Sequence, residues 1–101
     1  MSSQKKRPPI HPGAILADEL REIGVTMNRL AKALHVSPNR IGDIVAGKRG
    51  ITAETALRLS RYFGTSPEMW INLQAHYDLE VARDKFEAGL RKEIQPRRSA
   101  A

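Results

Sequence analysis

The chain has 101 residues, of which 41% are hydrophobic and 28% are charged, and its formal net charge at pH 7 is +6. This length suits one small domain whose core needs no support from a metal or a disulfide bond. The absence of cysteine excludes disulfides and thiolate metal sites, and it is compatible with the cytoplasm, where we expect the protein. No apolar run approaches the roughly 18 residues of a membrane span, and the basic excess favours a polyanionic partner, so we expect no membrane partner.

The two ends of the sequence differ in composition from the middle. Residues 1–11 are polar and basic and contain Pro8 and Pro9, which disfavour a helix, so we expect a flexible basic arm. Residues 92–101 show no packing pattern, and we expect a flexible tail there. The domain is therefore expected at residues 12–91, where it ends in an extended C-terminal helix.

The first helix is predicted at residues 12–23 and is followed by Gly24, a residue that commonly ends helices. Its apolar residues recur at helical spacing and are expected to be buried: Leu16, Leu20 and Ile23. Its outer face is acidic and carries Asp18, Glu19 and Glu22. Neighbouring carboxylates in a helix do not face one another, so we interpret this face as solvated rather than catalytic.

Two short helical patterns joined by a three-residue turn come next. The first follows the cap residue Thr26 and stops at His35, and the second is capped by Ser37, starts at Pro38 and ends at Gly47. Their apolar residues, expected to face inward, are Met27, Leu30, Ala31, Leu34, Ile41, Ile44 and Val45. This arrangement predicts a helix-turn-helix, whose second helix enters the major groove of DNA.

The polar residues on the outward face of this motif and in the loop after it are the candidate DNA-binding residues. Asn39 and Arg40, near the start of the second motif helix, can hydrogen-bond base edges bidentately. Lys48 and Arg49 lie between two glycines just after that helix, where a flexible loop suits phosphate contacts. The complete candidate set is Thr26, Asn28, Ser37, Asn39, Arg40, Asp43, Lys48 and Arg49. The alternative is an ordinary helical hairpin with a solvated polar face and a solubilising loop.

A fourth helix is predicted after the cap residue Thr52, and a fifth after Ser66 and Pro67. The residues of the fourth helix expected to pack are Ala56, Leu57, Leu59, Tyr62 and Phe63. The stripe of the fifth contains Trp70, Leu73, Tyr77 and Val81, and can continue through Phe86 and Leu90. This is more apolar surface than four short helices need. The residues from Trp70 to Val81 therefore either complete the monomer core or form a homodimer interface.

No catalytic constellation is found in the sequence. His11, His35 and His76 have no carboxylate at zinc-ligand spacing, and Ser60 and Ser66 have no sequence-level partner that would activate a nucleophile. A glycine-rich phosphate loop and a dinucleotide-binding motif are also missing. We therefore expect a protein that is not an enzyme and that binds no metal and no cofactor.

Three stretches of the sequence resemble the HigA antitoxins, a branch of the Xre/Cro-type helix-turn-helix proteins: HPGAILADELREIGV, LAKALHVSPNRI and GKRGITAETALRLSRYFGTSPEMWINLQAHYDLEVAR. The resemblance covers roughly residues 10–83, and GKRGIT and FGTSPEMW are its most specific parts. It implies an all-α, five-helix, lambda-repressor-like DNA-binding domain. It also implies a homodimer that binds double-stranded operator DNA, represses its own operon and neutralises a HigB-type toxin, a ribosome-dependent mRNA endonuclease.

Three positions depart from the pattern common in proteins of this kind. Met27 stands where a glutamine often reaches a DNA phosphate, so that contact is expected to be lost or replaced. His35 stands at a turn position usually held by glycine, and histidine is among the residues that tolerate a positive φ. Gly42 stands where a small hydroxyl is frequent. A glycine there costs about 1 kcal/mol against alanine, and it either lets the backbone approach DNA closely or weakens the reading helix.

The resemblance also implies a surface that binds the toxin. A toxin that cuts mRNA presents a basic surface, so we expect an acidic antitoxin face, for which Asp18, Glu19 and Glu22 are the candidates. The alternatives to an antitoxin are a stand-alone Xre-type repressor without a toxin partner and a protein-interaction adaptor that does not bind DNA. An adaptor would not need the basic and amide side chains of the motif.

Overall fold

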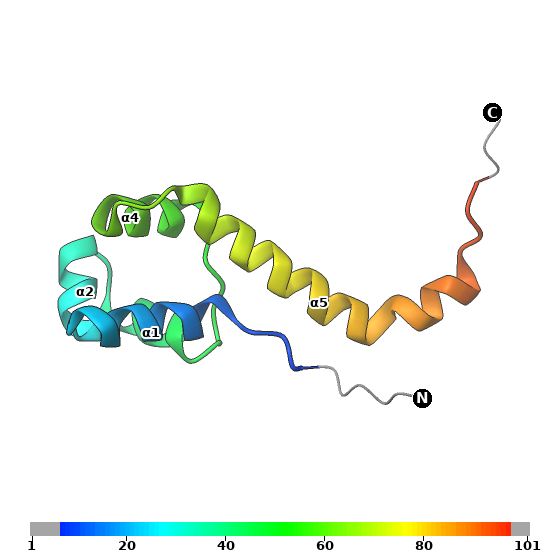
Figure 1. The fold of residues 1–101 in the computed structure, drawn as a ribbon, viewed down its shortest axis with the longest axis horizontal. Helices are drawn as coiled ribbons and strands as arrows, with labels where there is room; N and C mark the ends of the chain where they lie inside the picture. The colour runs from blue at the N-terminus through cyan, green and yellow to red at the C-terminus, as the bar shows by residue number, and fades with distance from the viewer. Residues whose placement is uncertain (1–6, 98–101) are drawn as a thin grey trace.

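The computed structural model describes residues 7–97, and this range contains five helices and no strand. The helices are α1 at Pro12–Ile23, α2 at Met27–Leu34, α3 at Pro38–Val45, α4 at Ala53–Phe63 and α5 at Pro67–Glu93. The first four form a bundle, and α5 begins against it and then extends away from it (Figure 1). The predicted all-α class is confirmed. The expected arm and tail extend into residues 1–6 and 98–101, which lie outside the described residues, so their flexibility stays a prediction.

Each helix begins at a side chain that accepts a hydrogen bond from the first turn, as N-cap residues do. Thr26 Oγ1 accepts from the backbone N–H of Arg29 at 3.1 Å, and Ser37 Oγ accepts from that of Arg40 at 3.2 Å. Thr52 and Ser66 cap α4 and α5 in the same way. For α1 the cap is His11, whose Nδ1 accepts from the backbone N–H of Gly13, and the sequence had not singled it out.

Three helices end at a residue in the left-handed conformation, which satisfies carbonyl groups of the last turn. Gly24 after α1 has φ 71°, Gly64 after α4 has φ 74° and His35 after α2 has φ 60°. The backbone N–H of His35 donates to the carbonyl of Lys32 at 3.2 Å. The histidine at this turn therefore performs the role that a glycine commonly performs.

The core lies where α1, α2, α3, α4 and the start of α5 meet. Its fully buried large side chains come from every helix: Leu16, Leu30, Ile41, Ile44, Leu59 and Trp70. The indole of Trp70 is 2% exposed, and its Nε1–H donates to Thr65 Oγ1 at 3.0 Å, so its polar group is satisfied inside the domain. The core thus fixes both motif helices against the rest of the bundle.

Four apolar residues that the sequence places in the core are instead exposed. Ile23, Met27, Leu57 and Tyr62 are between 40% and 60% exposed. The predicted stripes were wider than the contact each short helix makes, because a helix at the edge of a bundle buries only the narrow face toward its neighbours. In α4 that face includes Thr55 and Ser60, whose hydroxyls are hydrogen-bonded and can therefore be buried.

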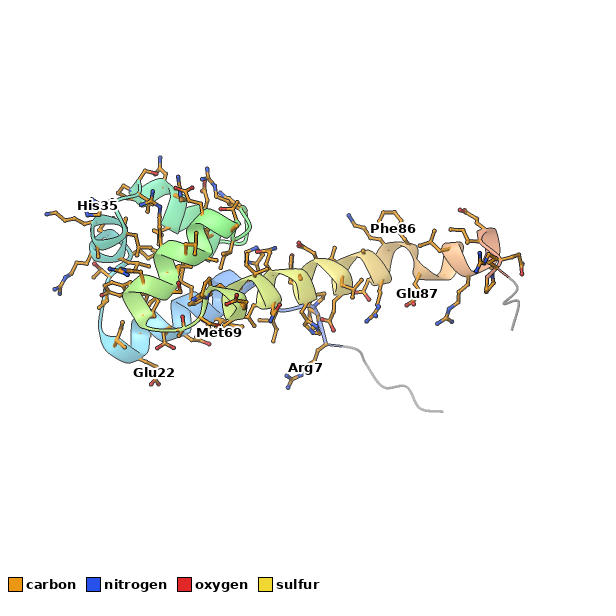
Figure 2. The ribbon with its side chains drawn as sticks, turned by 90° about the horizontal axis from the view of Figure 1, so that it is seen from above. Arg7, Glu22, His35, Met69, Phe86 and Glu87 are labelled. Atoms are coloured by element: carbon orange, nitrogen blue, oxygen red, sulfur yellow. The ribbon has the colours of Figure 1, made fainter. Side chains whose placement is uncertain are left out.

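The distal half of α5 contacts little of the bundle. Trp70 is the buried residue of this 27-residue helix, and Phe86 is 57% exposed on the part that extends beyond the other helices (Figure 2). Leu79, Leu90 and Ile94 are exposed as well. In the described part of the chain no helix combines the length and apolar character that crossing a bilayer requires.

Candidate nucleic-acid interface

The helix-turn-helix is formed by α2 and α3, which pack on each other, while α3 also packs on α1 and α2 on α4. Leu30, Ala31 and Leu34 of α2 and Ile41 and Ile44 of α3 are buried, so the opposite, polar side of α3 is left to solvent. The hydroxyls of Thr26 and Ser37 cap the two helices and therefore lie at their positive N-terminal ends. These ends are suited to phosphate groups.

Within the exposed side of α3, Asn39 is exposed and Arg40 is partly buried. Asn28 is exposed near the start of α2. Asn39 and Asn28 therefore lie where an approaching ligand can reach them, each in the first turn of its helix. The amide of Asn39 carries both a donor and an acceptor. In the major groove adenine presents the complementary pair, the N7 acceptor and the N6 amino donor.

The loop after α3 carries Lys48 and Arg49, both exposed. The backbone N–H groups of Lys48 and Arg49 donate to the carbonyl of Asp43 at 2.8 and 3.2 Å, and Gly47 adopts φ 77°. The guanidinium of Arg49 lies 3.9 Å from the carboxylate of Asp43. Asp43 thus holds the loop through its carbonyl, and its half-exposed carboxylate lies near a neighbouring cation.

At its other end the loop is attached to α5. The backbone N–H of Ile51 donates to Gln74 Oε1 at 2.7 Å, and Gln74 Nε2 donates to Asp78 Oδ1 at 2.9 Å. A Cβ added to Gly50 would lie 3.1 Å from the Gln74 amide, so the loop and this side chain are in close contact. The two basic residues are therefore carried by a backbone that is fixed at both ends.

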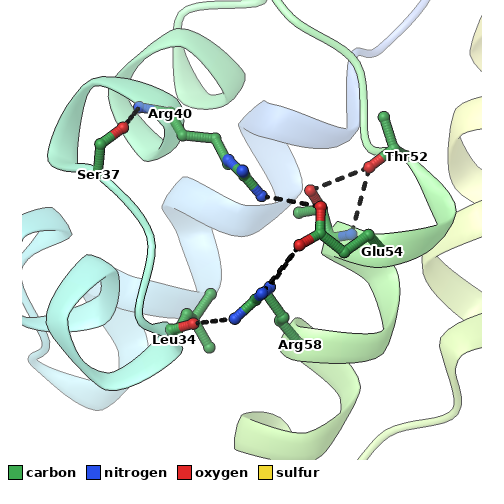
Figure 3. Close-up of polar contacts among 7 residues, drawn as sticks. Leu34, Ser37, Arg40, Thr52, Glu54 and Arg58 are labelled. Atoms are coloured by element: carbon green, nitrogen blue, oxygen red, sulfur yellow. Dashed lines mark hydrogen bonds and ion pairs between the residues drawn. The ribbon is translucent and has the colours of Figure 1, made fainter.

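Arg40 is paired with a carboxylate of α4. Its Nη1 lies 3.4 Å from Glu54 Oε1, while Glu54 Oε2 accepts from Arg58 Nε and Nη2 at 3.0 and 2.9 Å (Figure 3). Arg58 Nη1 also donates to the carbonyl of Leu34 at the end of α2, at 2.8 Å. This network, Leu34–Arg58–Glu54–Arg40, connects both motif helices to α4, and below we call it the Glu54 network.

The electrostatics of the network favour an ionised Glu54. The hydrogen bond from Arg58 and then the nearby charge of Arg40 hold the pKa of the Glu54 carboxyl below its ordinary value. The four-residue spacing of Glu54 and Arg58 is a signal for a helical ion pair and could have found that contact in the sequence. Arg40 is 14 residues from Glu54, and no local pattern indicates their pairing.

The residues proposed for a homodimer interface are distributed between the core and the surface. Trp70 completes the monomer core, the first of the two roles open to it. Leu73, Tyr77 and Val81 are partly buried, and the ring of Tyr77 meets the ring of His11 edge-on with centroids 4.8 Å apart. Exposed apolar surface on α5 lies farther along, at Leu79, Phe86 and Leu90.

The acidic residues of α1 are exposed, as expected for a solvated or partner-binding face. Asp18 pairs with Arg21 one turn later, so its charge is partly compensated, while Glu19 and Glu22 are exposed. Among residues 7–97 no group of three or more histidine and carboxylate side chains is placed to hold a metal ion.

Comparison with known proteins agrees with this geometry. Residues 16–70 match the helix-turn-helix family model. Virulence-associated protein I of Dichelobacter nodosus is 54% identical over 82 residues, 80% of this chain and 76% of that protein. An addiction module antidote protein of the HigA family from Coxiella burnetii superposes with a TM-score of 0.88 at 48% identity, covering 90% of this chain and 100% of that one. The Pseudomonas aeruginosa antitoxin HigA, solved with the higBA promoter, gives 0.85 at 47% identity, covering 87% and 97%.

Proposed function

Because this chain belongs to the HigA family of helix-turn-helix antitoxins, we propose that it is the antitoxin of a type II toxin–antitoxin pair. In this role it binds operator DNA of its own operon as a homodimer and represses transcription. It also neutralises a HigB-type mRNA endonuclease. It acts by binding, without a catalytic step.

The observation that carries the DNA-binding part is the position of α3. Its first turn exposes Asn39, and the fixed loop at its other end exposes Lys48 and Arg49. A short reading helix with phosphate-binding groups at both ends fits a major groove, where side chains at the helix start read bases and the flanking cations bind the backbone. The Pseudomonas HigA solved with promoter DNA supports the same use of this fold.

A homodimer is required because one short helix reads too few base pairs. Two copies related by a two-fold axis would read half-sites about one DNA turn, or ~34 Å, apart. We assign the contact to α5, from the partly buried Leu73, Tyr77 and Val81 outward to Phe86 and Leu90. Exposed apolar side chains on a helix that leaves the bundle favour an interface there.

The toxin is expected to meet a different surface from the operator. An endonuclease that binds mRNA presents basic residues, and Asp18, Glu19 and Glu22 form the exposed acidic face of α1 that complements them. The basic operator surface would repel the same partner.

The experiment starts from the open reading frame beside the gene. Its product, expressed alone, should stop growth, and co-expression of this chain should restore growth and yield a co-purified complex. A variant with Asn39→Ala and Arg40→Ala should lose repression of a promoter fusion and still co-purify with the toxin. Replacing Asp18, Glu19 and Glu22 by Lys should weaken toxin binding and spare repression. Loss of toxin binding in the folded Asn39/Arg40 variant would show that one surface serves both partners.

The second candidate is a stand-alone repressor with the same operator surface and no toxin. It is favoured if the neighbouring product is harmless and the wild-type chain still represses. A chain that shows neither repression nor toxin binding would be an adaptor, the third candidate.

A further inference from the structure

The Glu54 network contains the one ion pair of the candidate interface that joins a predicted base-reading side chain to another helix. We propose that Glu54 tunes DNA specificity: it holds Arg40 in the free protein, and a base edge with a good acceptor pair has to draw Arg40 away from it. This inference rests on the proposed operator binding. In these terms Glu54 is a positioning residue, because it acts through Arg40.

The distances show which of the two contacts of Glu54, with Arg40 or with Arg58, breaks more easily. Arg58 approaches the carboxylate with two N–H groups at 3.0 and 2.9 Å and is held by a third bond to the Leu34 carbonyl at 2.8 Å. Arg40 approaches with one N–H at 3.4 Å. Both N–H groups of Arg58 donate to the same oxygen, Oε2, and two charge-assisted bonds of ordinary length are stronger than one long bond, so the contact with Arg40 is the weaker one.

The carboxylate keeps its partner when Arg40 moves. If Arg40 turns toward DNA, Glu54 retains both bonds from Arg58 and is not left as an unpaired charge beside the phosphates. Release of Arg40 therefore costs only one exposed, single-bonded ion pair, a contact of modest strength in water. The pair is in contact with solvent, since the Glu54 side chain is 56% exposed and the Arg40 side chain 27%.

Operator DNA and unrelated DNA differ in what they offer Arg40 in return for leaving Glu54. A guanine in the right register offers Arg40 two acceptors, O6 and N7, and a bidentate bond replaces the contact with Glu54. A site without that guanine offers Arg40 only single acceptors, such as adenine N7 or thymine O4, and there Arg40 keeps its contact with Glu54. The operator complex therefore bears the cost of breaking the Arg40–Glu54 contact and the unrelated complex does not, so Glu54 weakens operator binding more than binding to unrelated DNA.

The experiment measures the dissociation constants for operator DNA and for unrelated DNA of the same length at one salt concentration. Glu54→Gln should tighten operator binding more than binding to unrelated DNA and raise the operator preference about two- to fivefold, the range expected for an exposed ion pair. Glu68→Gln, in the first turn of α5, makes the same change in net charge and should leave the preference unchanged. Glu54→Asp keeps the charge but shortens the side chain by one methylene, and it should also raise the preference. Thermal unfolding of each variant verifies that it is folded.

A double-mutant cycle separates this role from a structural one. In the Arg40→Ala background, Glu54→Gln should no longer change the operator preference, because the side chain it holds is absent. An unchanged preference in Glu54→Gln, or an equal change with and without Arg40, would overturn the inference while leaving the proposed function intact. A wild-type protein without any operator preference would overturn the proposed function, and this inference with it.

Discussion

Gly13 lies directly against the backbone of Ile44: a Cβ added at position 13 would lie 1.8 Å from the Ile44 carbonyl oxygen. The start of α1 and the end of α3 therefore approach more closely than any other residue would allow. This contact sets the position of α3 against the bundle, and it is made by backbone atoms that cannot move aside independently.

Gly13→Ala should destabilise the domain by about 1–3 kcal/mol or more, because the extra methyl group forces α1 and α3 apart. Gly42→Ala is the matched control, since nothing lies within 4 Å of a Cβ at position 42. That variant should be more stable by about 0.5–1 kcal/mol through its higher helix propensity. Urea unfolding measures both, and a Gly13→Ala variant as stable as the wild type would show that the helices have room to adjust.

The loop cations should contribute to binding without selecting sequence. Lys48→Ala and Arg49→Ala should each weaken binding to all DNA and reduce the slope of log K against log salt by about one unit. Salt titrations with operator and unrelated DNA measure this effect. If either variant loses affinity for operator DNA alone, the replaced residue reads bases instead.

Gln74 should also affect the slope of log K against log salt, because at Ile51 it holds the backbone of the loop that carries the two cations. Gln74→Ala removes the acceptor, and we expect weaker, salt-sensitive binding to any DNA. Gln74→Glu combined with Asp78→Asn keeps an acceptor oxygen in reach of the Ile51 N–H, sets no two carboxylates against each other and leaves the net charge unchanged, so it should restore the loop. Equal binding by Gln74→Ala and wild type would mean that the loop keeps its conformation without this bond.

Stability should depend on pH through Glu54. Its pKa is lowered from the ordinary value of 4.5, chiefly by the hydrogen bond from Arg58, so the folded state favours the ionised carboxylate. The stabilising contribution is present above the ordinary pKa and is lost as the pH falls through the lower, folded-state value. The difference in unfolding free energy between wild type and Glu54→Gln should therefore narrow on acidification. In an Arg58→Ala background the narrowing should be smaller, and a difference that grows toward acid would contradict the assignment.

Local sequence signals located the helices well. Cap residues followed by proline marked the starts of α3 and α5, and the predicted first helix coincides with α1 at Pro12–Ile23. His35 was expected at positive φ and adopts φ 60°. These features depend on a few neighbouring residues, which is why one sequence is sufficient to predict them.

Contacts between distant residues could not be predicted in the same way. The bond between Ile51 and Gln74 joins residues 23 apart, and the close approach of Gly13 to Ile44 depends on how two helices cross. Burial also depends on neighbours: Met27 has the right spacing for a core residue, but it lies at the edge of the bundle, where no helix covers it. Periodicity indicates which residues share a face, while the packing of the other helices decides how much of that face is buried.

The most direct test of the account is whether Asn39 on α3 reads a base. Binding should be measured for wild type and Asn39→Ala against the operator and a set of operators carrying single base-pair substitutions. We predict that Asn39→Ala weakens operator binding by about 1–3 kcal/mol and loses discrimination at one position in each half-site, as removal of a bidentate contact to adenine should. A variant that binds every sequence in the set more weakly by the same factor, or binds them all as the wild type does, would contradict the claim that α3 is the reading helix.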